Sequence, residues 1–132
     1  MSTQDIQTMT FEDVLDEHGY LVYTSVGTSM MPLLRQGQDV IEIRKKSPER
    51  CRINDIVLYK AGDKYILHRI VQVRKHDYVI LGDNCVNKEY GITDEQILGV
   101  LTGIIRDGKH ISMKDRKYLL YIRLRYLYRK FL

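Results

Sequence analysis

Along most of the chain, hydrophobic and polar residues alternate in short runs that Gly, Asp and Pro turns separate. Such alternation is typical of half-buried strands, because neighbouring side chains on a strand point to opposite faces. Strands are predicted over residues 20–26, 40–44, 56–59, 65–74, 78–81 and 97–105. Ala61-Gly62-Asp63 and Asp107-Gly108 are predicted as turns. Closely spaced strands of this kind favour a mainly β fold, a compact sandwich or barrel-like domain, over alternating strands and helices.

One short segment near the N-terminus has helical spacing instead. Phe11 to His18 is predicted as a helix, with Thr10 and Asp13 as a capping box at its start. Gly19 is expected to end this helix. The chain would then enter its first strand directly from the helix.

The last part of the chain, residues 114–132, combines helical spacing with basic charge. Leu120, Leu124 and Leu127 recur at helical spacing among tyrosines and arginines. We predict an amphipathic helix here, following a β-domain over residues 1–113. The helix is expected to dock on that domain with its arginines in solvent. In the alternative, leucine and aromatic residues on one side lie in a membrane interface, and the arginines pair with anionic lipid.

The composition of the 132 residues, 44% hydrophobic and 29% charged, is that of an ordinary globular protein. The formal net charge is +4, with acidic residues near the start and basic residues near the end. Cys51 and Cys85 are too few for a disulfide framework and lack the spacing of a zinc site. No window reaches the roughly 18 apolar residues of a membrane span, and the acidic start is unlike a secretory signal. We therefore expect the protein in the cytoplasm, with peripheral membrane contact as the alternative.

Ser29 is the candidate nucleophile. A serine acts as a nucleophile when a neighbouring base takes its proton and nearby donors stabilise the oxyanion that forms. Gly27, two residues earlier, permits a backbone conformation that other residues resist, which can aim amide groups at a carbonyl oxygen. Pro32 fixes the turn that follows.

The motif Gly27-Thr28-Ser29-Met30-Met31-Pro32 resembles the nucleophile motif of type I signal peptidases and LexA-type self-cleaving proteins. Three further blocks follow in that family's order: Asn54-Asp55-Ile56-Val57, His68-Arg69-Ile70-Val71 and Gly82-Asp83-Asn84. Bacterial signal peptidases and LexA-like proteins have a lysine where this chain has His68. The chain is therefore most similar to the histidine-type signal peptidases of the endoplasmic reticulum and archaea. The resemblance implies a LexA/signal-peptidase-like β-domain.

The resemblance also implies roles for individual residues. Ser29 would be the nucleophile and His68 the general base, since an imidazole with a pKa of about 6.5 accepts a proton near neutral pH. Asp83 is the first choice for the acid that orients the imidazole, while Glu89 and Asp94 are the other candidates. The backbone amides of Thr28 and Ser29 would form the oxyanion hole. No metal or cofactor is expected.

The chain departs from the family at several points. Asn54 replaces a glycine, although asparagine tolerates similar backbone geometry, and Cys85 replaces an asparagine. The family's signal peptidases also have a transmembrane anchor, which we do not expect here. The leading interpretation is a serine endopeptidase acting on a peptide or protein substrate.

Two other functions stay open. The first is a self-cleaving LexA-like regulator, which the position of Ala61-Gly62 downstream of Ser29 disfavours. The second is a non-enzymatic β-domain that binds a membrane or nucleic acid through its basic tail. Nucleic acid is the less favoured partner, because the chain has no RNA-binding aromatic motif or zinc-finger spacing.

Overall fold

A computed structural model of the protein describes residues 9–27 and 29–130. The described residues form an antiparallel sheet of eight strands, in the order β1-β2-β7-β3-β4-β5-β6, with β8 paired to β7. The strands are β1 (Tyr20–Thr24), β2 (Val40–Lys45), β3 (Ile56–Ala61), β4 (Lys64–Val73), β5 (Tyr78–Leu81), β6 (Glu89–Ile92), β7 (Ile97–Arg106) and β8 (Lys109–Ser112). The mainly β class predicted from alternation is confirmed. A short 3₁₀ helix, η1 (Asp94–Gln96), precedes β7, and neither η1 nor β6 was predicted.

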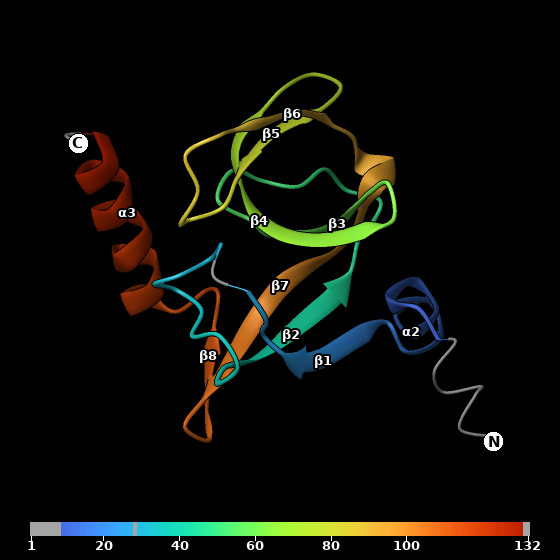
Figure 1. Ribbon diagram of the computed structural model, residues 1–132, viewed down its shortest axis with the longest axis horizontal. Coiled ribbons are helices and arrows are strands. Elements are labelled where there is room, and N and C mark those ends of the chain that lie inside the picture. The colour runs from blue at the N-terminus through green and yellow to red at the C-terminus, as the bar shows by residue number, and fades with distance from the viewer. Residues whose placement is uncertain (1–8, 28, 131–132) are drawn as a thin grey trace.

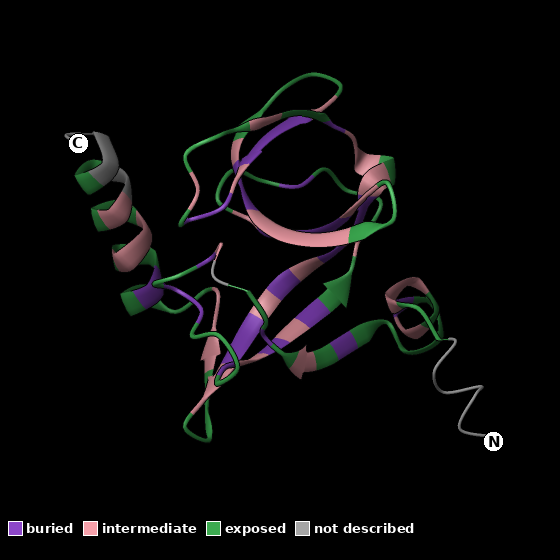
Figure 2. Ribbon diagram, viewed as in Figure 1, coloured by how far each residue is buried: buried purple, intermediate pink, exposed green. Residues whose placement is uncertain are grey.

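The sheet is strongly curved, so that β3 to β6 wrap into an upper layer while β1, β2, β7 and β8 form a lower one (Figure 1). Strand β3 is buried on both faces. Ile56 and Leu58 pack in a cluster that extends to β2 and β7, whereas Val57 and Tyr59 pack in a second cluster with β4 and β5. Each fully buried side chain of this kind stabilises the fold by about 1.5–3 kcal/mol. Figure 2 shows the resulting alternation of buried and less buried positions along β2 and β7.

The N-terminal helix, α2 (Phe11–His18), forms as predicted. The side chain of Thr10 accepts from the Asp13 amide and the Asp13 side chain accepts from the Thr10 amide, completing the capping box. Gly19 has a φ of 77° and its amide donates to the Leu15 carbonyl, which closes the helix.

The C-terminal helix, α3 (Arg116–Lys130), begins two residues after the predicted start. Its orientation differs in part from the sequence interpretation, because Tyr118 does not share a side with the leucines. Tyr118 is buried against the β-domain, whereas Leu120, Leu124 and Leu127 are exposed. The reason is chemical, since the Tyr118 hydroxyl accepts from buried Arg69 and a leucine at that position could not. Among the described helices, none has the length and apolar character needed to cross a membrane.

Candidate active site

The segment that follows β1 carries Ser29 and lies against the chain that leaves β5 (Figure 1). The amide of Asn84 donates to the Ser29 carbonyl at 2.7 Å, and the amide of Asp83 contacts Met30 Sδ at 3.4 Å. Met30 itself is buried in the first hydrophobic cluster, which anchors the segment. Gly27 has a φ of 81°, the backbone conformation that the sequence predicted for it. Two of the four sequence blocks are thus in direct contact.

A buried ion pair fixes the far end of the Ser29 segment. The carboxylate of Asp39 accepts from Nη2 of Arg106 at 2.6 Å and from the Arg35 amide at 2.9 Å. Arg106 also donates to the Leu33 carbonyl. The pKa of Asp39 lies below its ordinary value, because these donors outweigh the cost of burial. Sequence analysis missed Arg106, which lies far along the chain at the end of β7.

Ser29 and His68 both lie close to Gly82. A Cβ added to Gly82 would lie 2.8 Å from the Ser29 carbonyl oxygen and 3.0 Å from His68 Cδ2. Cδ2 is bonded to Nε2, so the Nε2 side of the imidazole and the Ser29 carbonyl oxygen both lie close to Gly82. The absence of a side chain at Gly82 is what permits this approach. The predicted nucleophile and base therefore both lie next to Gly82, the glycine of the fourth block.

The opposite edge of the imidazole contacts Glu89. His68 Nδ1 lies 3.3 Å from Glu89 Oε1 and 3.4 Å from the Tyr59 hydroxyl, and that hydroxyl donates to Glu89 Oε1 at 2.6 Å. Two acceptors at Nδ1 favour the tautomer that has its proton there, which leaves the lone pair on Nε2. Tyr59, which holds the carboxylate, was not predicted from the sequence.

Burial sets the protonation state of His68, whose side chain is 13% exposed. Burial lowers the pKa of His68 below its ordinary value of about 6.5, and the charge of Glu89 opposes this effect only in part. The imidazole is consequently neutral at neutral pH. Burial and the Glu89 carboxylate also raise the pKa of the Tyr59 hydroxyl, so Tyr59 stays a hydrogen-bond donor.

Asp83, the first choice from the sequence, has a different partner. Its two carboxylate oxygens accept from Nε and Nη2 of Arg69, both at 2.8 Å. The side chains of Arg69 and Asp83 are only 8% and 11% exposed. Neighbouring side chains on a strand point to opposite faces, so His68 and Arg69 take different acids. The order of preference is therefore corrected: Glu89 contacts the imidazole, and Asp83 contacts the arginine.

The other predicted residues are also placed. Asp94 accepts from the Tyr78 hydroxyl and lies 3.1 Å from Arg50 Nε, which assigns it to an ion-pair cluster around η1. Asn54 has a φ of 74°, a left-handed conformation that asparagine tolerates better than most residues. Thr28, whose amide the sequence assigns to the oxyanion hole, lies outside the described residues.

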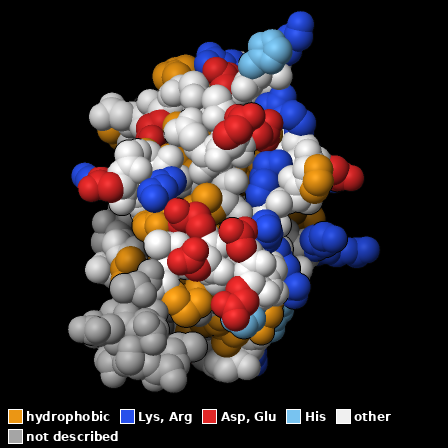
Figure 3. Space-filling view, turned by 90° about the vertical axis from the view of Figure 1, so that its right-hand side faces the viewer, with side chains coloured by type: hydrophobic (Ala, Val, Ile, Leu, Met, Phe, Trp, Pro, Cys, Tyr) orange, Lys and Arg blue, Asp and Glu red, His pale blue; other side chains and the backbone are white. Residues whose placement is uncertain are grey.

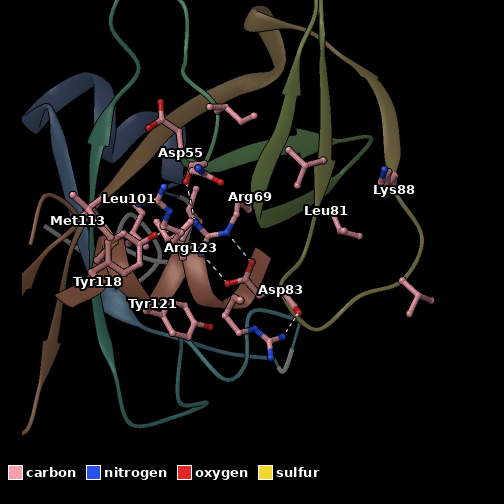
Figure 4. Close-up of a pocket in the computed structure, with 18 residues that line it drawn as sticks. Asp55, Arg69, Leu81, Asp83, Lys88, Leu101, Met113, Tyr118, Tyr121 and Arg123 are labelled. Carbon is pink, nitrogen blue, oxygen red and sulfur yellow. Dashed lines mark hydrogen bonds and ion pairs between the residues drawn. The ribbon is translucent and has the colours of Figure 1, made fainter. Parts of the chain in front are cut away.

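A pocket of about 1070 Å³ lies between α3 and the β-domain, next to the Arg69–Asp83 pair. Figure 4 shows the guanidinium of Arg69 facing the carboxylate of Asp83, with Tyr118 and Tyr121 projecting from α3 beside them. The Tyr118 hydroxyl accepts from Arg69 Nη1 at 3.1 Å, and Arg125 donates to the Asp83 carbonyl at 3.3 Å. Helix α3 is thereby joined to the loop after β5, whose Asn84 amide donates to the Ser29 carbonyl.

Within the described ranges, no group of three His, Cys, Asp or Glu side chains is arranged to hold a metal ion. The chemistry at hand is that of Ser29, a neutral imidazole and a carboxylate on its far side. Comparison with protein-family models gives no match to the chain. A search of curated proteins likewise finds no similar sequence.

Proposed function

We propose that the protein is a serine endopeptidase in which Ser29 is the nucleophile, His68 the general base and Glu89 the acid that orients it. The observation that carries this proposal is the position of His68, whose Nδ1 edge contacts Glu89 and Tyr59 while its Cδ2 atom and the Ser29 carbonyl oxygen both lie close to Gly82. A base held by a carboxylate and placed beside a serine is the general arrangement of serine hydrolases. The ordered blocks that resemble histidine-type signal peptidases support the same assignment.

In this mechanism, Ser29 Oγ attacks the carbonyl carbon of a peptide bond while His68 Nε2 takes its proton. The imidazolium that forms is stabilised by Glu89, whose carboxylate Tyr59 holds in place. The amides of Thr28 and Ser29 would stabilise the oxyanion. His68 then gives its proton to the leaving amine as the peptide bond breaks. Water hydrolyses the acyl-enzyme with His68 again as base, which restores the free serine.

The surroundings of Ser29 fit a substrate with apolar side chains. Val26 and Val86 are largely exposed, one just before the nucleophile motif and the other just after the Gly82 block. Met31, two residues after Ser29 in the motif, is also exposed. Apolar groups held in solvent around a reactive centre favour an extended peptide with apolar residues near the cleaved bond.

Self-cleavage is less favoured than cleavage of a separate substrate. Ala61-Gly62 lies at the turn between β3 and β4, where Ala61 pairs with Lys64 and Gly62 has a φ of 65°. A peptide bond in such a tight turn is not available to a nucleophile that needs an extended substrate. This arrangement supports an enzyme that acts in trans.

Replacing Glu89 with glutamine tests the orienting role directly. We expect the cleavage rate at neutral pH to fall by about 10²-fold, because an amide does not stabilise the imidazolium, and the acid of a triad contributes less than the serine or the histidine. The charge of Glu89 raises the pKa of His68, so its removal lowers that pKa further. The acid limb of the pH–rate profile should therefore shift to lower pH. The matched control is Glu95→Gln, which alters an exposed acid of η1. An unchanged rate, or a shift to higher pH, would contradict the role of Glu89.

Replacing Gly82 with alanine tests the approach of Ser29 to His68. The new Cβ would meet the Ser29 carbonyl at 2.8 Å, and a main-chain atom there cannot move without displacing the nucleophile. A displacement of about 1 Å is expected to slow cleavage by about 10²-fold. Gly62→Ala is the contrasting variant: it strains a positive φ at the distant hairpin, so it should lower thermal stability without slowing cleavage. A Gly82→Ala enzyme as fast as wild type would refute the geometry.

A further inference from the structure

The outer face of α3 is apolar although the helix is already docked. Leu120, Leu124 and Leu127 are 56%, 57% and 44% exposed, and their i, i+4, i+7 spacing places them on one stripe of the helix. A helix at the surface of a globular domain normally has polar residues on this side. The stripe is therefore a candidate contact surface, which we name the leucine stripe.

Helix α3 cannot rotate to bury the leucine stripe in place of its inner face without losing the contacts of that face. Tyr118 is buried and accepts from Arg69, while Tyr121 and Ile122 pack against the first hydrophobic cluster. Arg125 also donates to the Asp83 carbonyl. Rotating the helix to bury the leucines would break these hydrogen bonds and leave Arg69 with one donor unsatisfied. The leucine stripe thus faces outward in the folded protein.

The positive charge of α3 favours a negatively charged binding partner for the leucine stripe. Arg116, Lys117 and Arg123 are exposed on α3, and the helix contains no acidic residue. A second copy of the chain, docked stripe to stripe, would bring like charges together. A bilayer surface with anionic headgroups offers both an apolar layer for leucines and negative charge for the flanking cations.

The opposite side of the molecule carries acidic side chains that α3 lacks. Helices α2 and α3 lie at opposite sides of the sheet (Figure 1). Figure 3 looks onto the α2 side, where acidic side chains lie among Lys and Arg side chains. In α2, Asp13, Asp16 and Glu17 are exposed. An anionic surface would therefore attract the α3 side, which has cations and no acid, more strongly than the mixed α2 side.

We infer that the leucine stripe and the cations beside it dock the protein on a membrane rich in anionic lipid. This docking would be peripheral, with α3 lying in the interface. Because Tyr118 and Arg125 join α3 to the Arg69–Asp83 pair, the candidate active site would be held near the bilayer surface. The inference concerns binding alone, so it is independent of the peptidase proposal.

Vesicle flotation with the full chain tests this inference. Wild type should float with vesicles of mixed phosphatidylcholine and phosphatidylglycerol, should not float with phosphatidylcholine alone, and should release as salt is raised. Leu124→Asp should lower binding at least tenfold, while Val73→Asp, which alters an exposed valine at the end of β4, should bind as wild type does. Ser29→Ala should also bind as wild type does, which separates docking from catalysis.

A charge-reversal variant tests whether loss of vesicle binding in Leu124→Asp could result from misfolding instead. The triple change Arg116→Glu, Lys117→Glu and Arg123→Glu leaves every leucine in place and should abolish flotation, with an unchanged circular dichroism spectrum. Wild type that stays unbound, Leu124→Asp that binds normally, or equal binding to neutral vesicles would overturn the inference. A stable dimer in sedimentation analysis that Leu124→Asp dissolves would also overturn it, since the stripe would then be an interface between copies.

Discussion

Ser29→Ala is expected to lower the rate of peptide cleavage by about 10⁴- to 10⁶-fold, because no other group in the mechanism can form the acyl-enzyme. The fold should be unchanged, since Ser29 is held through its main-chain carbonyl, which alanine retains. The measurement is the initial rate at which a mixture of unstructured peptides is cut, followed by mass spectrometry.

Ser47→Ala is the matched control for this variant. Ser47 is exposed in the connection between β2 and β3, so its replacement should leave the cleavage rate at the wild-type value. Peptides cut equally by wild type and Ser29→Ala, or left intact by wild type, would show that Ser29 is not a nucleophile.

His68→Ala should cause a loss of similar size, because Ser29 has no other base beside it in the mechanism. In wild type, the cleavage rate should rise with pH as the imidazole loses its proton. The midpoint of this rise should lie below pH 6.5, since burial lowers the pKa of His68. The measurement is the same peptide assay, carried through the acid range.

The control for His68 is His76→Ala, which alters an exposed histidine in the turn between β4 and β5. The double variant of Ser29 and His68 gives a sharper test. Residues that act as one unit are not additive, so the double variant should be no slower than either single variant. Losses that multiply would mean that the two residues act independently.

Strand positions were largely predictable from the sequence, because alternation records which side of the sheet each residue faces. Strand β6 was missed for a physical reason. Its sequence, Glu89 to Ile92, has no clear alternation and includes Gly91 with a φ of 77°. Pairing of Ile80 with Glu89 in the neighbouring strand is what builds β6. The strand that the pattern could not predict is also the one that brings Glu89 to His68.

The choice between two acids could not be made from sequence order. Asp83 and Glu89 both follow His68 in the sequence, so the order of the residues does not say which acid contacts the imidazole. The deciding group is Arg69, which takes Asp83 in a buried bidentate pair. Alternation along β4 could have indicated this, since it places His68 and Arg69 on opposite faces.

The sequence pattern also could not predict which face of α3 is buried. Tyrosines and leucines both recur at helical spacing there, so periodicity alone does not say which face is buried. The hydrogen bond between Tyr118 and Arg69 decides it, and its partner is distant in the sequence. The membrane alternative grouped the leucines with the tyrosines, and the structure separates the exposed leucines and Tyr128 from buried Tyr118.

The most direct test of the proposed catalytic site is to identify which side chain a fluorophosphonate modifies. The reagent phosphonylates serines that a neighbouring base activates, and peptide mapping by mass spectrometry locates the adduct. We predict a single adduct on Ser29, formed more slowly in Glu89→Gln and absent in His68→Ala. An adduct on another residue, or none on Ser29 in the wild-type protein, would contradict the proposed site.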